Sequence, residues 1–226
     1  MRLSKDICLK LFCFIERRLK ISEFQKWVYD CDKLNSELEI DDYLTLIEFD
    51  YTSEDVYYKM DKILHDILDK YVIFRGDVIK ESGIIGRCIT NKGRYRFHKE
   101  DNTFGITKGK DYSILTIDIQ QDSSGNKYVQ YVIMDDESRV YYVPSSVFII
   151  EHKELPCDWI IEEDKNSISL EPKDFNIKYY SGKNSFWEDF HDDVEEALIT
   201  FAKYLHNHDI EVPEKFKIYA YKAFCL

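Results

Sequence analysis

The chain has 226 residues and a formal net charge of −12, from 31 Lys and Arg against 43 Asp and Glu. Hydrophobic residues make up 44% and charged residues 33%, which excludes a disordered chain and predicts a globular protein of one or two domains. Because nucleic acid and anionic membranes are themselves negative, this charge disfavours both as partners and favours a basic one.

The N-terminal sequence MRLSKDICLKLFCFIERRLK has charges spaced through its apolar residues, so it lacks the unbroken apolar core of a signal peptide. No apolar run approaches the roughly 18 residues that a membrane helix needs. We therefore expect a cytoplasmic protein with no membrane partner. The six Cys form no C-x-x-C pair, which favours reduced thiols over a zinc or redox site, and no cofactor is expected.

Residues 1–71 have the apolar spacing of short helices. Ser4 is the expected cap of the first helix, and the motifs S-x-x-Q at Ser22 and S-x-x-E at Ser36 predict capping boxes for the next two. A broad apolar stripe after Ser53 predicts the last helix. Together these helices are expected to form an N-terminal bundle.

Residues 72–155 change from helical spacing to alternation of apolar and polar residues, with polar turns between the candidate strands. Pro144-Ser145-Ser146 has the character of a short helical turn before the final strand. Five or so antiparallel strands with such a turn predict a small, partly open β-barrel. The candidate strands are 87–91, 95–98, 112–119, 128–134, 140–143 and 147–150.

Residues 156–226 mix both patterns. A capping box, S-x-x-E at Ser185, predicts one long helix that continues to Leu205, and the weak alternation over 216–224 predicts a closing strand. The overall prediction is an α+β fold with an N-terminal helical bundle, a central small antiparallel β-barrel and a C-terminal mixed segment. Short strand-like segments before the long helix lie at 159–161, 168–170 and 177–180.

Basic and aromatic residues alternate along one candidate strand, with Arg94, Arg96 and His98 on one face and Tyr95 and Phe97 on the other. On a small barrel this arrangement suits single-stranded nucleic acid, through phosphate contacts and base stacking. A half-buried strand with a solvated outer face is the favoured explanation. Since the whole chain is acidic, a small regulatory or nucleic-acid-binding module is the secondary hypothesis.

Three patterns touch on metal binding or catalysis, and none is complete. His191 and Glu195 are four residues apart on the expected long helix, and His206 and His208 form an H-x-H pair, but a metal site needs at least three convergent ligands. The tripeptide EDK at 163–165 faintly resembles a magnesium-dependent nuclease site, and a charged exit from a strand explains it as well. We expect no metal and no enzymatic activity.

Acidic residues crowd the loop and short helix that follow the second predicted helix, beside an aromatic side chain. They outnumber the local Lys, and an acidic rim next to aromatic residues suits a basic partner. A solvated acidic face is the alternative interpretation. The candidate partner-binding residues are Tyr29, Asp30, Asp32, Glu37, Glu39, Asp41 and Asp42.

The sequence ISEFQKWVYDCDKLNSELEIDDYLTLIEFDY resembles the helical immunity-type proteins found beside secreted polymorphic toxins in bacteria. Those proteins have an E-F-x-x-W-x-Y helix, then acidic and leucine-rich helices that end in L-I-x-x-D-Y. The resemblance, over about residues 10–70, implies an inhibitor that covers the active site of a toxin, and an acidic inhibitor suits a basic nuclease toxin. The matching residues are Glu23, Phe24, Trp27, Tyr29, Leu46, Ile47, Asp50 and Tyr51.

A second stretch, about residues 86–151, resembles small bacterial Src-homology-3-like modules through ITKGKDYSIL and IMDDESRVYYVPSSVFII. Ile106 stands where those modules have Leu, and an inserted DSSGN widens one hairpin, so the resemblance implies the barrel but does not extend to its ligand groove. The predicted function is an immunity or antitoxin-like protein that neutralises a protein toxin by stoichiometric binding. The toxin, the binding face and the oligomeric state stay open.

Overall fold

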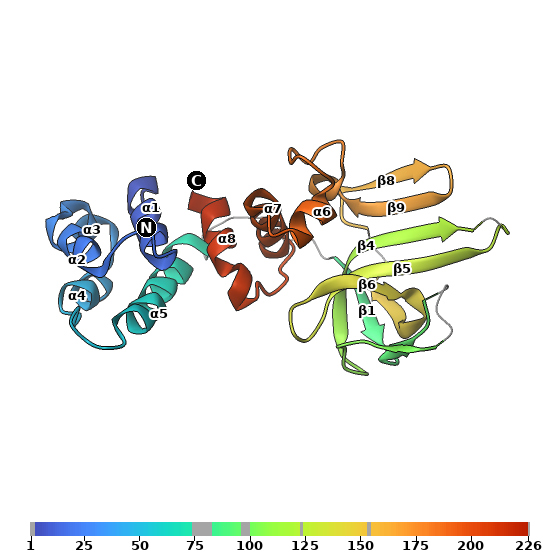
Figure 1. Ribbon diagram of the computed structural model, residues 1–226, viewed down its shortest axis with the longest axis horizontal. Coiled ribbons are helices and arrows are strands. Elements are labelled where there is room, and N and C mark those ends of the chain that lie inside the picture. The colour runs from blue at the N-terminus through green and yellow to red at the C-terminus, as the bar shows by residue number, and fades with distance from the viewer. Residues whose placement is uncertain (1–2, 74–82, 96–99, 123, 153–154, 226) are drawn as a thin grey trace. The chain divides into compact units, whose positions relative to one another are not determined.

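The computed structural model describes the chain except for residues 1–2, 74–82, 96–99, 123, 153–154 and 226 (Figure 1). The chain divides into two compact units, where the sequence suggests three segments. The helical unit comprises Met1–Val78 and Glu214–Leu226, and the sheet unit comprises Ile79–Pro213. The C-terminal segment is therefore shared between the two units. None of the helices in the described part of the chain has the length and apolar content that a membrane span requires.

In its described residues, the helical unit has six helices and one π-helical turn over Asp69–Ile73. Figure 1 labels the helices. The predicted capping boxes at Ser22 and Ser36 do not form. The second helix begins one residue before Ser22, where the Glu23 carboxylate accepts from the backbone N–H of Lys20 at 2.9 Å, and Ser36 lies inside the third helix. The helices are α1 Lys5–Ile15, α2 Ile21–Asp30, α3 Asp32–Glu37, α4 Ile40–Ile47, α5 Val56–Leu68 and α8 Glu214–Cys225.

The core of the helical unit gathers the apolar stripes that the sequence spacing predicts. Phe14 of α1 is fully buried, with its ring centre 4.3 Å from that of Phe24 on α2 and 5.4 Å from that of Tyr57 on α5. Aromatic pairs at these separations add to the free energy of burial. One ring cluster thus joins α1 to the next helix in the chain, α2, and to the more distant α5.

Helix α8 replaces the closing strand predicted over 216–224, so that prediction is wrong. Phe216, Ala220 and Tyr221 are buried at the spacing of one helix face. The hydroxyl of Tyr221 donates to Asp69 in the π-helical turn at 2.8 Å, and the ammonium of Lys217 reaches the other oxygen of Asp69 at 3.2 Å. These contacts place α8 in the core of the helical unit, where only a helix presents all three residues together.

Within the described residues, the sheet unit contains a seven-stranded antiparallel sheet that is not closed into a barrel, so the α+β class is confirmed and the barrel is not. The long strand β4 explains the open form, because its first half pairs with β1 and its second half with β9. A bulge between Ile114 and Thr116 marks the change of partner. The order is β6-β5-β4-β1-β7, with the hairpin β8–β9 joined to β4. The strands are β1 Ile84–Cys88, β4 Asp111–Gln121, β5 Lys127–Met134, β6 Val140–Pro144, β7 Phe148–His152, β8 Trp159–Asp164 and β9 Ser167–Pro172.

Several finer expectations for the sheet unit can be compared with the structure. The short helical turn before the last strand of the meander is present as a 3-10 turn over Ser145–Val147. The segment 177–180 forms a turn instead of a strand. Of the strand expected at 95–98, only Tyr95 is described, and it lies outside a strand; two short strands, β2 Lys92–Gly93 and β3 Asn102–Thr103, pair nearby.

The long helix predicted from Ser185 is two helices, α6 Phe186–His191 and α7 Glu195–Asn207. Its capping box is confirmed, since the backbone N–H of Glu188 donates to Ser185 and the Glu188 carboxylate accepts from the backbone of Ser185. The break falls at Asp193, whose φ of 55° is a left-handed conformation that no helix can continue through. Phe186 stacks on Phe175 with ring centres 4.1 Å apart, and both residues are buried. This contact fixes α6 in a buried core of the sheet unit.

Candidate functional site

Two of the predicted partner-binding acids form ion pairs or hydrogen bonds within the helical unit. The carboxylates of Glu39 and Asp42 each lie 2.8 Å from the ammonium of Lys70, and Asp42 also accepts from the hydroxyl of Tyr71 at 2.6 Å. Burial, aided by the hydrogen bond to Asp42, raises the pKa of Tyr71. These contacts tie the start of α4 to the π-helical turn. The partly buried Asp42 stabilises the fold, whereas Glu39 is paired with Lys70 but stays exposed.

Two further candidates also have partners within the unit. A carboxylate oxygen of Glu37 accepts from the backbone N–H of Ser4 at 2.6 Å, which satisfies an amide at the start of α1. Tyr29 is half exposed, and its hydroxyl donates to the carbonyl of Ile47 at 3.2 Å, which links α2 to the end of α4. Tyr29 therefore keeps an accessible ring on a fixed side chain.

The remaining acids, Asp30, Asp32 and Asp41, are exposed. Asp30 ends α2 and Asp32 begins α3, on either side of Cys31, and both line a groove. Asp41 lies in the first turn of α4 and is not among the residues of that groove. The structure thus brings Asp30 and Asp32 together and separates Asp41 from them.

Asp41 and Asp42, adjacent in sequence, should differ sharply on substitution. Asp42→Ala removes two charge-assisted hydrogen bonds from a partly buried site, so we expect a loss of about 2–3 kcal/mol in the free energy of unfolding. Asp41→Ala, the matched control, should cost less than about 1 kcal/mol, because only the helix dipole favours an exposed acid there. Urea denaturation measures both. Equal losses in the two variants would contradict the assignment of Asp42 to the fold.

The groove has a volume of about 620 Å³ and lies among α1, α2 and α3. Trp27 is half-buried, with its ring centre 5.5 Å from that of buried Phe24, and Leu9 is 39% exposed. Open grooves of this size with a largely apolar surface are common binding sites. The lining residues are Asp6, Ile7, Leu9, Lys10, Cys13, Trp27, Asp30, Cys31, Asp32 and Lys33.

Sequence reasoning found Asp30 and Asp32 as partner-binding residues, included Trp27 only in the immunity-type pattern, and missed the contribution of α1. Leu9 and Cys13 stand four residues apart, which places them on one face of that helix. They lie beside the main apolar stripe and therefore lack the signal of a core position. The only sign of them in the sequence is that the apolar face of α1 is wider than packing against one neighbouring helix requires.

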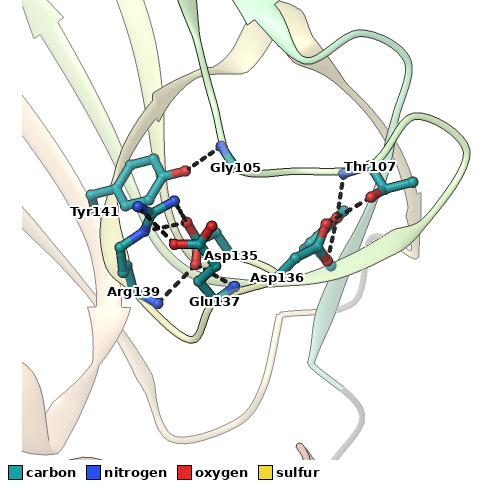
Figure 2. Close-up of polar contacts among 8 residues, drawn as sticks. Gly105, Thr107, Asp135, Asp136, Glu137, Arg139 and Tyr141 are labelled. Atoms are coloured by element: carbon teal, nitrogen blue, oxygen red, sulfur yellow. Dashed lines mark hydrogen bonds and ion pairs between the residues drawn. The ribbon is translucent and has the colours of Figure 1, made fainter.

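The sheet unit contains a dense polar cluster where the β5–β6 turn meets the segment after β3 (Figure 2). The fully buried carboxylate of Asp135 accepts from the backbone N–H groups of Glu137 and Arg139 at 2.9 and 2.8 Å. The guanidinium of Arg139 binds the same carboxylate at 2.7 Å. Asp135 therefore fixes the turn, as buried carboxylates with several donors do.

Gly105 lies directly against this turn. Its backbone N–H donates to the hydroxyl of Tyr141 at 3.0 Å, and a Cβ there would lie 2.5 Å from atoms of both Asp135 and Arg139 (Figure 2). Only glycine permits that approach. On the other side of the turn, Asp136 accepts from Thr107 at 2.7 Å. The cluster fastens a loop to a hairpin, which is a structural role.

Two buried carboxyl groups lie on neighbouring strands of the sheet unit. Asp118 of β4 is hydrogen-bonded to Gln120 and Ser169, and Glu171 of β9 accepts from Asn176 at 2.9 Å. Burial raises the pKa of both carboxyl groups, and the negative charges of Glu162 and Asp118 raise the pKa of Glu171 further. Their partners are uncharged, so ionised Asp118 is a cost to the fold at neutral pH.

Asp118→Asn should therefore stabilise the sheet unit at neutral pH. In the folded protein the pKa of Asp118 lies above its ordinary value, so the protonated carboxyl is favoured there. The stability gained by Asp118→Asn should therefore shrink as the pH falls through that raised pKa. The control is Asp136→Asn, where partial burial is outweighed by hydrogen bonds from Lys110, Thr107 and Tyr112 that hold the pKa down. That variant should lose stability. Melting temperatures at neutral and mildly acidic pH test both the expected gain and the expected loss. A lower melting temperature of Asp118→Asn at neutral pH would refute the prediction for Asp118.

The basic strand proposed for nucleic acid is only partly described. Arg96 and His98 lie outside the described residues. Arg94 is exposed, and its guanidinium lies 3.1 Å from the carboxylate of Asp101, which lowers its attraction for a phosphate. Tyr95 is half-buried and its hydroxyl donates to the carbonyl of Tyr142 at 2.5 Å.

The metal and nuclease patterns do not assemble. His191 ends α6 and Glu195 begins α7, so the break at Asp193 removes the one-helix spacing on which that pair depended. Residues 163–165 lie at the turn of the β8–β9 hairpin. Among the described residues, no group of three or more His, Cys, Asp or Glu side chains is arranged to hold a metal ion.

Comparisons with known proteins find no matching family model, no similar curated protein and no similar solved structure. The strongest candidate site is thus the groove of the helical unit, with Leu9 and Trp27 as its apolar surface and Asp30 and Asp32 at its rim.

Proposed function

We propose that the chain is a cytoplasmic immunity or antitoxin-like protein that neutralises a basic protein toxin by stoichiometric binding through the groove of the helical unit. The observation that supports this most is the coincidence of an open apolar groove with exposed carboxylates, Asp30 and Asp32, within the stretch that resembles immunity-type proteins. Apolar anchors surrounded by charge are what a tight, specific interface needs.

The apolar groove and its acidic rim have different roles in binding. Leu9 and Trp27 offer apolar surface that a partner side chain can cover, which favours slow dissociation. Asp30 and Asp32 attract a basic partner and speed its approach, an effect that salt screens. Inhibition then follows from covering the active site of the toxin rather than from chemistry on it.

We also propose that β1 and β4–β7 form a Src-homology-3-like module. Two observations support this proposal: β1, β4, β5 and β6 pair in chain order while β7 returns to pair with β1, and a 3-10 turn precedes β7. The hairpin β8–β9 and the helices α6 and α7 extend the unit beyond such a module.

The test is co-expression of the chain with the product of the neighbouring gene. We expect that product to be toxic alone, and to form a one-to-one complex with the chain in which its toxicity is lost. Association should slow as salt rises. A harmless neighbour, or a toxic one that the chain neither binds nor inhibits, would contradict the proposal.

A further inference from the structure

Strand β8 is an edge of the sheet in the described part of the chain, since it pairs only with β9. Figure 1 shows it as the outer arrow of its hairpin. At its centre Ile161 is 68% exposed, although a β-branched residue in a strand normally packs against neighbours. An exposed isoleucine on an open edge is the kind of feature that a further strand covers.

The strand register shows which backbone groups face the open edge. The backbone N–H of Lys173 donates to the carbonyl of Asp158 at 2.9 Å, which makes these two residues a hydrogen-bonded pair. Because such pairs alternate along an antiparallel ladder, residues 160, 162 and 164 point toward β9. The N–H and C=O groups of Ile161 and Glu163 therefore point away from β9, into the open edge.

The other side of β9 gives the same register independently. The backbone N–H of Gln121 donates to the carbonyl of Asn166 at 2.8 Å, so even-numbered residues of β9 face β4 and odd-numbered ones face β8. Both ladders agree on the orientation of β8. Its edge thus offers two adjacent outward residues, each with one donor and one acceptor.

The side chains beside these backbone groups define what an added strand should carry. On one face of the sheet, the register aligns Ile117 of β4, Leu170 of β9 and Ile161 of β8 in a row. An added strand would continue this row with an aliphatic residue. Glu163 lies two residues further along the same face and is exposed, as is Asp164 on the opposite face. Both favour a cationic neighbour.

We propose that the open edge of β8 binds an extended basic segment of a partner protein, which adds to the sheet as a further strand. An aliphatic side chain of the segment lies beside Ile161, and Lys or Arg lies beside Glu163 and Asp164. Two copies of this edge would bring their acidic residues together, so charge disfavours self-association through β8 and selects a basic segment. This surface belongs to the sheet unit and does not rest on the function proposed for the helical unit.

The experiment titrates the full chain with a short synthetic peptide in which Val alternates with Lys, followed by amide NMR shifts and calorimetry. We expect the amides of Ile161 and Glu163 to shift and to become protected from exchange. The control peptide has the same sequence with alternate backbone nitrogens methylated. It keeps every charge but cannot pair as a strand, so it should bind roughly tenfold more weakly or worse, as the loss of a few net hydrogen bonds implies.

A matched pair of protein variants tests the same edge. Ile161→Pro removes an N–H that points away from β9, so the β8–β9 ladder should survive while peptide binding falls. Ile161→Ala keeps the N–H and loses only the aliphatic contact, so it should bind with intermediate affinity. Equal binding of the methylated and unmethylated peptides, or shifts confined to residues outside β8, would overturn the proposal by showing that charge alone attracts the peptide. Failure to bind any peptide would overturn it too. The acids of β8 would then serve only to prevent other strands from pairing with this edge.

Discussion

Replacing Tyr221 with Ala should destabilise the helical unit by about 3–5 kcal/mol, the loss typical of a large aromatic side chain removed from a core. Tyr221 is fully buried, and its ring meets that of His65 edge-on with centres 5.8 Å apart. Burial and the neighbouring carboxylate of Asp69 raise the pKa of Tyr221, so the hydroxyl stays protonated and donates its hydrogen bond. The variant loses both the packing and this bond.

Hydrogen exchange measured by mass spectrometry can localise the effect. In Tyr221→Ala, protection of α1 and α5 should fall, while protection of β4 and β5 in the sheet unit should stay unchanged. Tyr221→Phe is the control that keeps the packing and should lose only about 1–3 kcal/mol, because Asp69 then lacks one donor. If α1 and α5 were indifferent to Tyr221→Ala, α8 would not belong to the helical unit.

Leu9→Lys should weaken binding of the toxin by about thirtyfold or more, the effect of losing roughly 2 kcal/mol at a central interface position. The substitution removes an apolar contact at the groove and adds a positive charge that repels a basic partner. Leu44→Lys on α4 is the matched control. Leu44 has the same exposed fraction, 39%, but does not line the groove.

Both variants should fold, since a partly exposed Leu on a helix can be replaced by Lys at small cost. Titration calorimetry with the toxin then compares them with the native chain. Equal weakening by Leu9→Lys and Leu44→Lys would mean that general charge, and not the groove, determines affinity. Weakening by Leu44→Lys alone would move the interface to the outer face of α4, beside Asp41.

The helices of the helical unit follow from sequence because their apolar residues recur every three or four positions. The stretch FKIYAYKAF in α8 was misjudged because it satisfies two periods at once: it alternates, and it also places Phe216, Ala220 and Tyr221 on one helix face. The choice between them depends on Asp69, which is far away in the sequence. Local pattern alone does not contain that contact.

Most strands of the sheet unit are predicted close to their places, apart from those expected at 95–98 and 177–180, but the pairing of the second half of β4 is not predicted. A small, partly open barrel is expected because a five-strand meander with a helical turn suits that fold. The second half of β4 instead pairs with β9, and this pairing joins Ile117 to Leu170 across a long stretch of chain. Alternation in a strand says which side chains share a face and nothing about which strand lies beside it.

The acidic residues show the same limit at the level of side chains. The sequence shows that acids crowd the chain around residue 40, but Glu39 and Asp42 share an ion pair with Lys70 in another element. Only the folded arrangement shows that these two are paired within the helical unit and that Asp30 and Asp32 lie at the groove.

The most direct test of the central claim, that the toxin binds at the groove, uses the thiols already present. Cys13 and Cys31 line the groove, and Cys157 is exposed in the sheet unit as an internal control. Alkylation of each thiol is followed by mass spectrometry with and without saturating toxin. The account predicts that the toxin slows alkylation of Cys13 and Cys31 and leaves Cys157 unchanged. Unaltered alkylation of Cys13 and Cys31 in the saturated complex would contradict it.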